Sequence, residues 1–200
     1  RNLVLDSDFY LTSVGNKAVS FVNDLKDLRG KTISVSVDIE VVKAVAPPSG
    51  ACRIGFEPSV KYVDGTTQYF GAWKQLTAGE SVKGRITNSM TLKDVEIESV
   101  VQNSVYVQTG GDVVKAGRPK LELGSKATEW TPAIEDIDKA IKDADKKAQD
   151  VTNSVNDMSL DSKLTPVEKI QLKTDYDSIT AEFSTTLASA DAFNLTSSSE

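Results

Sequence analysis

The amino-acid sequence predicts a mainly β protein: an antiparallel β-sandwich over residues 1–131, then a C-terminal α-helical hairpin or coiled-coil segment over residues 132–191 and a tail over residues 192–200. In the first part, apolar residues recur at every second position in short runs, and Gly, Pro and Asp-Gly turns separate these runs. This pattern is typical of β-strands. From Ile134 onward, apolar residues recur at alternating spacings of three and four, which indicates amphipathic helix.

The change from strand to helix falls within residues 120–132. Residues 120–123 alternate Lys and Glu with Leu, which is the period-two pattern of a half-buried strand. Thr131 followed by Pro132 is typical of a helix start, because the hydroxyl can cap free N–H groups and the fixed φ of proline suits the first helical position. We expect Trp130, between the two patterns, to pack against the end of the β-domain.

The clearest strand is Thr32–Val42, in which β-branched residues alternate with polar ones, so that one face meets a core and the other meets water. Asp64-Gly65 predicts a hairpin turn between the strands Ser59–Val63 and Thr66–Trp73. Further strands are predicted at Asn2–Leu5, Lys17–Val22, Ala51–Phe56, Glu80–Thr87, Ser89–Glu98 and Ser104–Thr109. About ten strands at regular spacing favour an antiparallel sandwich.

The helical part contains two predicted helices. The first carries apolar residues at the a and d positions of a heptad repeat: Ile134, Ile137, Ile141, Ala144, Ala148, Val151, Val155 and Met158. Isoleucine at both positions of the first heptad favours trimers, so a homotrimer through this segment is one alternative. The second helix is predicted to begin at Thr165–Glu168, a capping box with proline at its first position. If this helix folds back on the first, the two pair within one chain.

Charge and hydropathy limit the classes of partner. The net charge is −6, the isoelectric point is near 4.9, and the basic residues are scattered, which argues against nucleic acid and anionic membranes. No apolar run approaches the roughly 20 residues that span a bilayer, so membrane insertion is not expected. The sequence begins at Arg1 without Met, and we expect it to be a fragment of a longer protein.

Catalysis is not expected. The chain has no His and a single Cys, Cys52, so neither a Ser-His-Asp nor a Cys-His nucleophile can be built. Glu57 with Asp38 or Glu40 is the one carboxylate pair considered for glycoside hydrolysis, which needs two acids about 5–9 Å apart. Nothing in the sequence brings these acids together, and we therefore predict that the chain is not an enzyme.

Two motifs lie at the ends of the predicted β-domain. Residues 2–9 read Asn-Leu-Val-Leu-Asp-Ser-Asp-Phe, and residues 119–132 read Pro-Lys-Leu-Glu-Leu-Gly-Ser-Lys-Ala-Thr-Glu-Trp-Thr-Pro. In combination they resemble the jelly-roll carbohydrate-binding modules of siphophage tail-tip proteins, from phages of lactococci and streptococci. Among these the resemblance is greatest to accessory baseplate proteins. Residues 163–169 are similar to the helical connectors that often follow such modules.

This resemblance implies a non-catalytic module that binds a host cell-wall polysaccharide. It also implies a place in the virion, at the tail tip or baseplate, where the protein contacts other baseplate or tail proteins and acts outside the host cell. Single sugar sites bind weakly, so oligomerisation through the helical segment would raise avidity. Two alternatives stay open: a structural baseplate component that binds no sugar, and an accessory binding module of a cell-wall hydrolase.

The aromatic residues around the Asp64-Gly65 turn form the candidate saccharide site, because aromatic rings stack on the C–H faces of sugars. Alternation along Thr66–Trp73 turns Phe70 toward the core and leaves Tyr69 and Trp73 exposed, although both could also line the core. The full candidate set is Tyr62, Tyr69, Trp73, Gln68 and Arg53. Tyr106 and Gln108, which alternate outward on another predicted strand, form a second choice.

No cofactor is required for this function, but the resemblance leaves a structural calcium open. Modules of this kind often hold one near their joined ends, and Asp6, Asp8 and Glu122 lie in the two end motifs. Carboxylate oxygens are hard ligands that suit Ca²⁺. The alternative is that these acids cap turns or pair with Lys.

Overall fold

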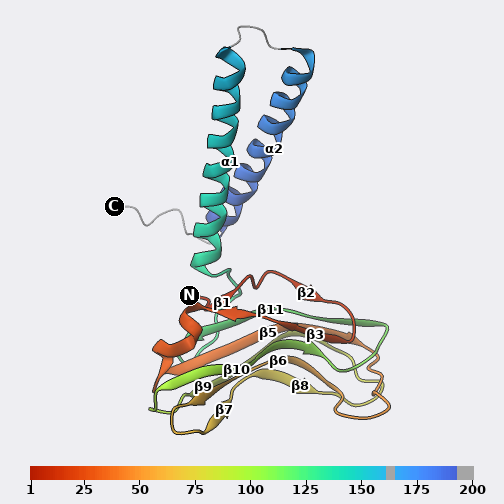
Figure 1. Ribbon diagram of the computed structural model, residues 1–200. Helices are drawn as coiled ribbons and strands as arrows, with labels where there is room; N and C mark the ends of the chain where they lie inside the picture. The colour runs from red at the N-terminus through yellow and green to blue at the C-terminus, as the bar shows by residue number, and fades with distance from the viewer. Residues whose placement is uncertain (161–164, 193–200) are drawn as a thin grey trace. The chain divides into compact units, whose positions relative to one another are not determined.

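The computed structural model describes residues 1–160 and 165–192 (Figure 1). The chain divides into two compact units, Arg1–Ile134 and Glu135–Glu200. The predicted tail at 192–200 lies outside the described residues, except for Ala192, which ends the last helix. None of the described helices combines the length and the apolar composition that a membrane span requires.

The first unit is a β-sandwich, as the sequence predicts. Its strands are β1 (Val4–Leu5), β2 (Tyr10–Leu11), β3 (Gly15–Ala18), β4 (Ser20–Phe21), β5 (Thr32–Val42), β6 (Arg53–Tyr62), β7 (Thr67–Tyr69), β8 (Ala72–Gln75), β9 (Val82–Thr91), β10 (Ile97–Val107) and β11 (Val113–Leu123), with a 3-10 segment at Val22–Leu28. A five-stranded sheet has the order β3-β10-β6-β7, with β8 also paired to β6, and a four-stranded sheet has the order β2-β11-β5-β9. All of these pairs are antiparallel, and the two sheets stack in Figure 1.

The core lies between the two large sheets. The predicted strand Thr32–Val42 is confirmed with the same bounds as β5. Its inward residues are buried: Ile33, Val35, Val37, Ile39 and Val41. Residues of β6 meet them from the opposite sheet and are also buried: Ile54, Phe56, Val60 and Tyr62. The remaining residues of β5 and β6 therefore form the two outward faces of the sandwich.

The observed strand bounds around Pro58 differ from the predicted ones in two ways. The predicted strands Ala51–Phe56 and Ser59–Val63 are one continuous strand, β6, while the predicted strand Thr66–Trp73 is divided into β7 and β8. The register is the same on both sides of this division, since Ser59 pairs with Tyr69 and Gly55 pairs with Trp73. Pro58 has no N–H to donate, so the ladder is interrupted opposite it without any change of register.

The prediction that the polar residues of 120–123 face solvent is wrong. Lys120 and Glu122 are buried, whereas Leu123 is 59% exposed. The Lys120 Nζ donates to Thr128 Oγ1 and to the Glu129 carbonyl, both at 2.6 Å, and Glu122 accepts from the N–H and hydroxyl of Thr128. Burial lowers the pKa of Lys120, and the nearby Glu122 carboxylate opposes this change. The chain after β11 therefore folds back over this part of the four-stranded sheet.

The second unit consists of α1 (Ile134–Leu160) and α2 (Pro166–Ala192), and α1 begins two residues later than Pro132. The predicted capping box is confirmed: the Thr165 N–H donates to Glu168 Oε2 at 2.7 Å, and the Glu168 N–H donates to Thr165 Oγ1 at 3.3 Å. Lys147 of α1 pairs with Glu182 of α2 at 2.6 Å, which links the helices as a hairpin. Most of their large apolar side chains remain exposed: Ile134, Ile141, Val155, Val167, Ile170, Tyr176, Phe183 and Leu187.

Candidate functional site

On the outward face of the five-stranded sheet, three neighbouring strands, β6, β8 and β10, carry aromatic and charged side chains close together. On β6, this face carries Arg53, Gly55, Glu57 and Ser59, because alternate residues point away from the core. Gly55 pairs with Trp73 of β8 on one side and with Tyr106 of β10 on the other. The two aromatic residues that the sequence analysis treated as separate choices therefore lie in one row across the sheet.

Arg53 occupies the space between these two rings. Its guanidinium Cζ lies 5.5 Å from the centroid of the Trp73 ring and 5.1 Å from that of Tyr106. Both distances fall within the range of cation–π attraction. A Cβ at Gly55 would lie 2.6 Å from the Ala72 carbonyl oxygen, so glycine is needed for β8 to approach β6 at this point.

Two polar side chains hold the guanidinium. The Arg53 Nε donates to Gln108 Oε1 at 3.0 Å, and its Nη1 lies 3.8 Å from Glu57 Oε2. Gln108, the other member of the second choice, thus joins the same site. We define the aromatic row as Trp73, Arg53 and Tyr106, with Glu57 and Gln108 as its polar partners. Tyr69 lies further along the same face, where it pairs with Ser59.

The predicted orientation of the residues at 69–73 is confirmed. Tyr69 is 55% exposed and Trp73 is 42% exposed, whereas Phe70 is buried. Large rings that remain in water on the outside of a β-sandwich are available to stack on a ligand.

Two hydroxyls on this face have no hydrogen-bond partner among the described residues, namely those of Ser59 and Tyr106. Tyr106 is only 4% exposed, and burial together with the Glu57 carboxylate raises the pKa of its phenol. A buried hydroxyl without a partner is unfavourable, so a rearrangement that gave these groups a partner would be favoured.

The prediction that Tyr62 completes the aromatic platform is wrong. Tyr62 lies on the core side of β6 with Val60 and is fully buried, and its hydroxyl donates to Gln68 Oε1 at 2.5 Å. Gln68 Oε1 also accepts from the N–H of Lys93, and Gln68 Nε2 donates to the Thr91 carbonyl. Tyr62 and Gln68 therefore join β7 to the end of β9, and Arg53 is the one predicted polar residue that lies in the aromatic row.

The structure does not bring the predicted calcium ligands together. Asp8 accepts a hydrogen bond from Arg118 at 3.0 Å, and Glu122 is held by Thr128 and Lys120. In the described part of the chain, no group of three or more Asp, Glu, Cys or His side chains could hold a metal ion. The side chains as placed do not fit a calcium site, and calcium binding stays a prediction.

The carboxylates considered for catalysis lie on opposite faces of the sandwich. Glu57 is on the outward face of the five-stranded sheet, whereas Asp38 and Glu40 are on that of the four-stranded sheet. Asp38 accepts from Arg85 Nη1 at 2.7 Å and from the Tyr10 hydroxyl at 3.2 Å. Glu57 therefore cannot act with either acid in a glycosidase mechanism.

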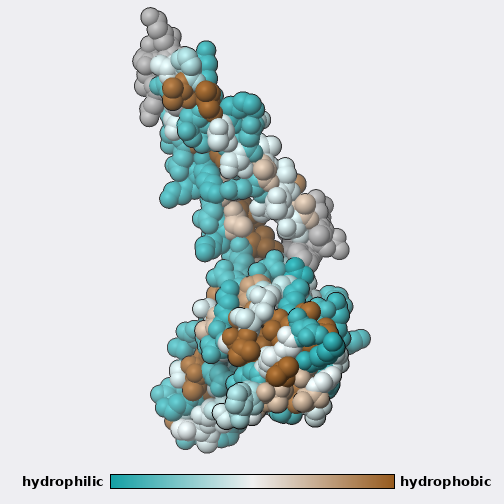
Figure 2. All heavy atoms as spheres, turned by 90° about the vertical axis from the view of Figure 1, so that its right-hand side faces the viewer, coloured by the Kyte–Doolittle hydropathy of each residue, from teal (hydrophilic) through white to brown (hydrophobic). Residues whose placement is uncertain are grey.

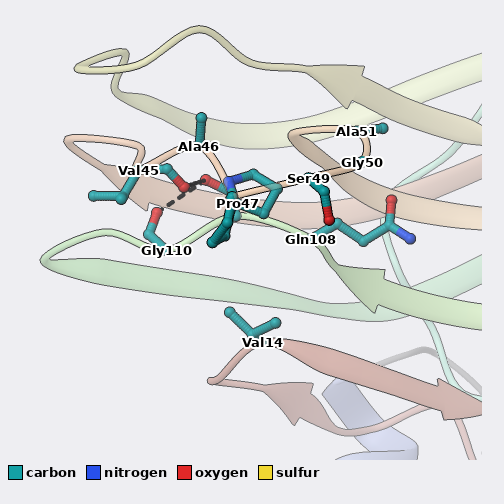
Figure 3. Close-up of a pocket in the computed structure, with 11 residues that line it drawn as sticks. Val14, Val45, Ala46, Pro47, Ser49, Gly50, Ala51, Gln108 and Gly110 are labelled. Atoms are coloured by element: carbon teal, nitrogen blue, oxygen red, sulfur yellow. Dashed lines mark hydrogen bonds between the residues drawn. The ribbon is translucent and has the colours of Figure 1, made fainter.

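A pocket of about 480 Å³ adjoins the aromatic row at Gln108 (Figure 3). It is lined by Val14, by residues 45–51 and by residues 108–110, which belong to three different loops. The two prolines and the glycine of Ala46–Gly50 predict a loop, because they cannot sustain a β-ladder. They give no local signal for a pocket, because Val14 and Gln108 come from distant parts of the chain.

Comparison with known proteins gives distant structural similarities, among them two carbohydrate-binding modules. No family model and no curated protein matches the chain. The C-terminal family 22 carbohydrate-binding module of Clostridium thermocellum Xyn10B is 17% identical, with a TM-score of 0.29, over 56% of this chain and 63% of the module, which is less than two thirds of its length. A xylan-binding domain from the same module family is 20% identical, with a TM-score of 0.29, over 62% of this chain and 72% of that domain.

Proposed function

We propose that the β-domain binds a saccharide, without catalysis, on the outward face of its five-stranded sheet. The observation that carries this proposal is the aromatic row, in which the exposed ring of Trp73 flanks the guanidinium of Arg53. The exposed ring of Tyr69 lies further along the same face. Sugar rings present flat patches of C–H groups, and exposed aromatic rings bind such patches by stacking.

The polar groups of the row supply both kinds of hydrogen bond that sugar hydroxyls need. The Arg53 guanidinium is a donor only, whereas the Glu57 carboxylate is an acceptor. The phenol of Tyr106 is protonated at neutral pH, and its hydroxyl, which has no partner among the described residues, can donate to a ligand once a rearrangement exposes it. These groups orient a ligand over the rings, which favours binding of one sugar geometry over others.

The biological setting is proposed from the end motifs alone. Residues 2–9 and 119–132 resemble modules of phage tail-tip proteins, so the proposed ligand is a host cell-wall polysaccharide. The proposed location is the virion tail tip or baseplate, among other tail proteins and outside the host cell.

Replacing Tyr69 by alanine tests the proposal. We expect about tenfold weaker binding to soluble cell-wall polysaccharide or xylan, measured by isothermal titration calorimetry, because one stacking ring is lost. Leu123→Ala is the matched control, since Leu123 is a similarly exposed large apolar residue on β11 of the other sheet and should leave affinity unchanged. The proposal is wrong if the unaltered protein binds none of the saccharides or if the two variants bind equally well.

We further propose that the helical unit assembles copies of the chain, with a trimer as the expected state. The large apolar side chains left exposed on α1 and α2 would be covered by the helices of neighbouring copies, and helices in proteins gain most of their stability from such packing. Several weak sugar sites would then act together.

Light scattering after size exclusion measures this assembly. The full chain should elute as an oligomer, and residues 1–134 alone should be a folded monomer, because they form a separate compact unit. Phe183→Glu should dissociate the oligomer, whereas Ser184→Glu, a neighbouring exposed position, should not. A full chain that stays monomeric at all concentrations would rule out assembly.

A further inference from the structure

The pocket beside Gln108 is apolar and open to solvent (Figure 3). Its apolar lining is Val14, Val45, Ala46, Pro47, Pro48 and Ala51. Val14 is 65% exposed and Val45 is 58% exposed. Figure 2 faces this end of the β-domain and shows hydrophobic side chains gathered on it. Single exposed valines are ordinary on a protein surface, but here two of them line the same hollow.

Backbone hydrogen bonds connect two of the loops that line the pocket. The N–H of Val45 donates to the Gly110 carbonyl, and the N–H of Gly110 donates to the Val45 carbonyl, both at 2.9 Å. The Thr109 hydroxyl lies 3.2 Å from the Val45 carbonyl and 2.9 Å from that of Gly110. Two of the three loops are thereby fixed to each other, which lowers the cost of ordering them around a ligand.

The pocket also offers donors, all of them neutral. The backbone N–H groups of Ser49, Gly50 and Ala51 make no hydrogen bond to any described residue. Gln108 uses its Oε1 to accept from Arg53, and this leaves its amide N–H groups to donate. None of the lining residues is charged, so the pocket does not suit a phosphate, a carboxylate or an ammonium group.

The hydrogen bond from Arg53 to Gln108 joins the pocket to the aromatic row. Arg53 lies beside the Trp73 ring, and Gln108 lines the pocket. A saccharide that stacked on Trp73 and extended along Arg53 toward Gln108 would bring its next substituent to the pocket.

We propose that this pocket binds an acetyl group on the saccharide, as an O-acetyl ester or an N-acetyl amide. The methyl group packs against the valines and prolines, and the carbonyl oxygen accepts from the free N–H donors at residues 49–51 or from Gln108. An unsubstituted hydroxyl has no methyl group to pack against the apolar lining, and its acceptor oxygen lies closer to the sugar ring than the carbonyl oxygen of an acetyl group does. This inference rests on the proposed saccharide binding, and it specifies the class of sugar.

Pairs of oligosaccharides that differ only in the substituent test the inference on the full chain by calorimetry. Chitotetraose against cellotetraose compares an N-acetyl amide with a hydroxyl, and acetylated xylo-oligosaccharides before and after mild alkaline deacetylation test the ester. We expect about tenfold tighter binding of the acetylated member of at least one pair, from methyl burial and one hydrogen bond.

Val45→Ser and Val14→Ser should reduce this preference to about twofold and leave the affinity for the unsubstituted sugar unchanged. Trp73→Ala should weaken both members of a pair equally. Equal affinity within both pairs, or a preference that survives in both valine variants, would overturn the acetyl pocket while saccharide binding itself still stands. If no oligosaccharide or polysaccharide binds, the proposed function and the acetyl pocket fail together.

Discussion

Trp73→Ala is expected to weaken saccharide binding about thirtyfold, which corresponds to about 2 kcal/mol, the typical loss when a tryptophan at the centre of an interface is removed. The ring is 42% exposed and therefore offers a large apolar surface to a sugar. It also lies 5.5 Å from the Arg53 guanidinium, so its removal takes away one of the two rings that flank this group. Calorimetry with the saccharide that binds best gives the loss directly.

Trp73→Phe is the graded control, because it keeps a flat ring at the same place, and we expect only about threefold weaker binding. The thermal midpoint of both variants should stay close to that of the unaltered protein, since the Trp73 side chain lies on the outside of β8. If Trp73→Ala keeps full affinity for a saccharide that the unaltered protein binds, the outward face of the five-stranded sheet is not the site.

The exposed rings could be predicted from the sequence because their orientation depends on local alternation. Phe70 lies between Tyr69 and Trp73, and a strand that buries the first must expose the others. The same rule applied to Val60 and Tyr62 places both on one face of β6, and Val60 is fully buried. The prediction for Tyr62 was wrong because it considered only proximity to the turn and not the phase of its own strand.

The rest of the site could not be predicted, because it depends on which strands are neighbours. Tyr106 comes beside Gly55 only through the pairing of β10 with β6, and Gln108 then reaches Arg53. This register is set by packing across the whole sheet, so the sequence of β6 or of β10 alone does not predict it.

The burial of Lys120 has a similar cause. The alternation of residues 120–123 is regular, but the residues that cover this face, Thr128 and Glu129, belong to the segment that follows. A period-two pattern identifies two faces, and it does not say that the polar face is open to water. A buried Lys–Glu pair is stable here because both groups are also hydrogen-bonded to that segment.

Asn2 holds the two ends of the β-domain together, and Asn2→Asp is expected to destabilise the fold by about 3 kcal/mol at pH 7. The side chain is fully buried. Its Nδ2 donates to Ser7 Oγ at 3.0 Å and to the Thr131 carbonyl at 2.9 Å, and its Oδ1 accepts from the N–H groups of Val4 and Leu121. The substitution replaces a donor that faces a carbonyl oxygen with a carboxylate oxygen.

The loss of stability expected for Asn2→Asp depends on pH, and burial of the new carboxyl group decides whether the loss grows or shrinks as the pH rises. We expect a carboxyl group at this place to have a folded-state pKa above its unfolded value of about 3.9, because burial and the facing Thr131 carbonyl oxygen disfavour its charge more than the N–H groups of Val4 and Leu121 favour it. The loss of stability should therefore be smallest below about pH 4 and should grow as the pH rises toward the raised pKa. Urea denaturation at pH 4 and pH 7 measures this difference.

Asn2→Ala and Asn16→Asp separate the two causes of the loss. Asn2→Ala removes the same hydrogen bonds without adding a charge, so its loss should be similar at both pH values. Asn16→Asp adds the charge at an exposed position of β3 and should change stability little at either pH.

Equal losses of stability for Asn2→Asp at pH 4 and pH 7 would mean that position 2 admits water. A urea midpoint like that of the unaltered protein would mean that Asn2 does not join the ends of the β-domain. Asn2 contacts both the first strand and the chain after β11. The free energy of unfolding that is lost when its side chain is replaced therefore measures how much the contact between the two ends stabilises the β-domain.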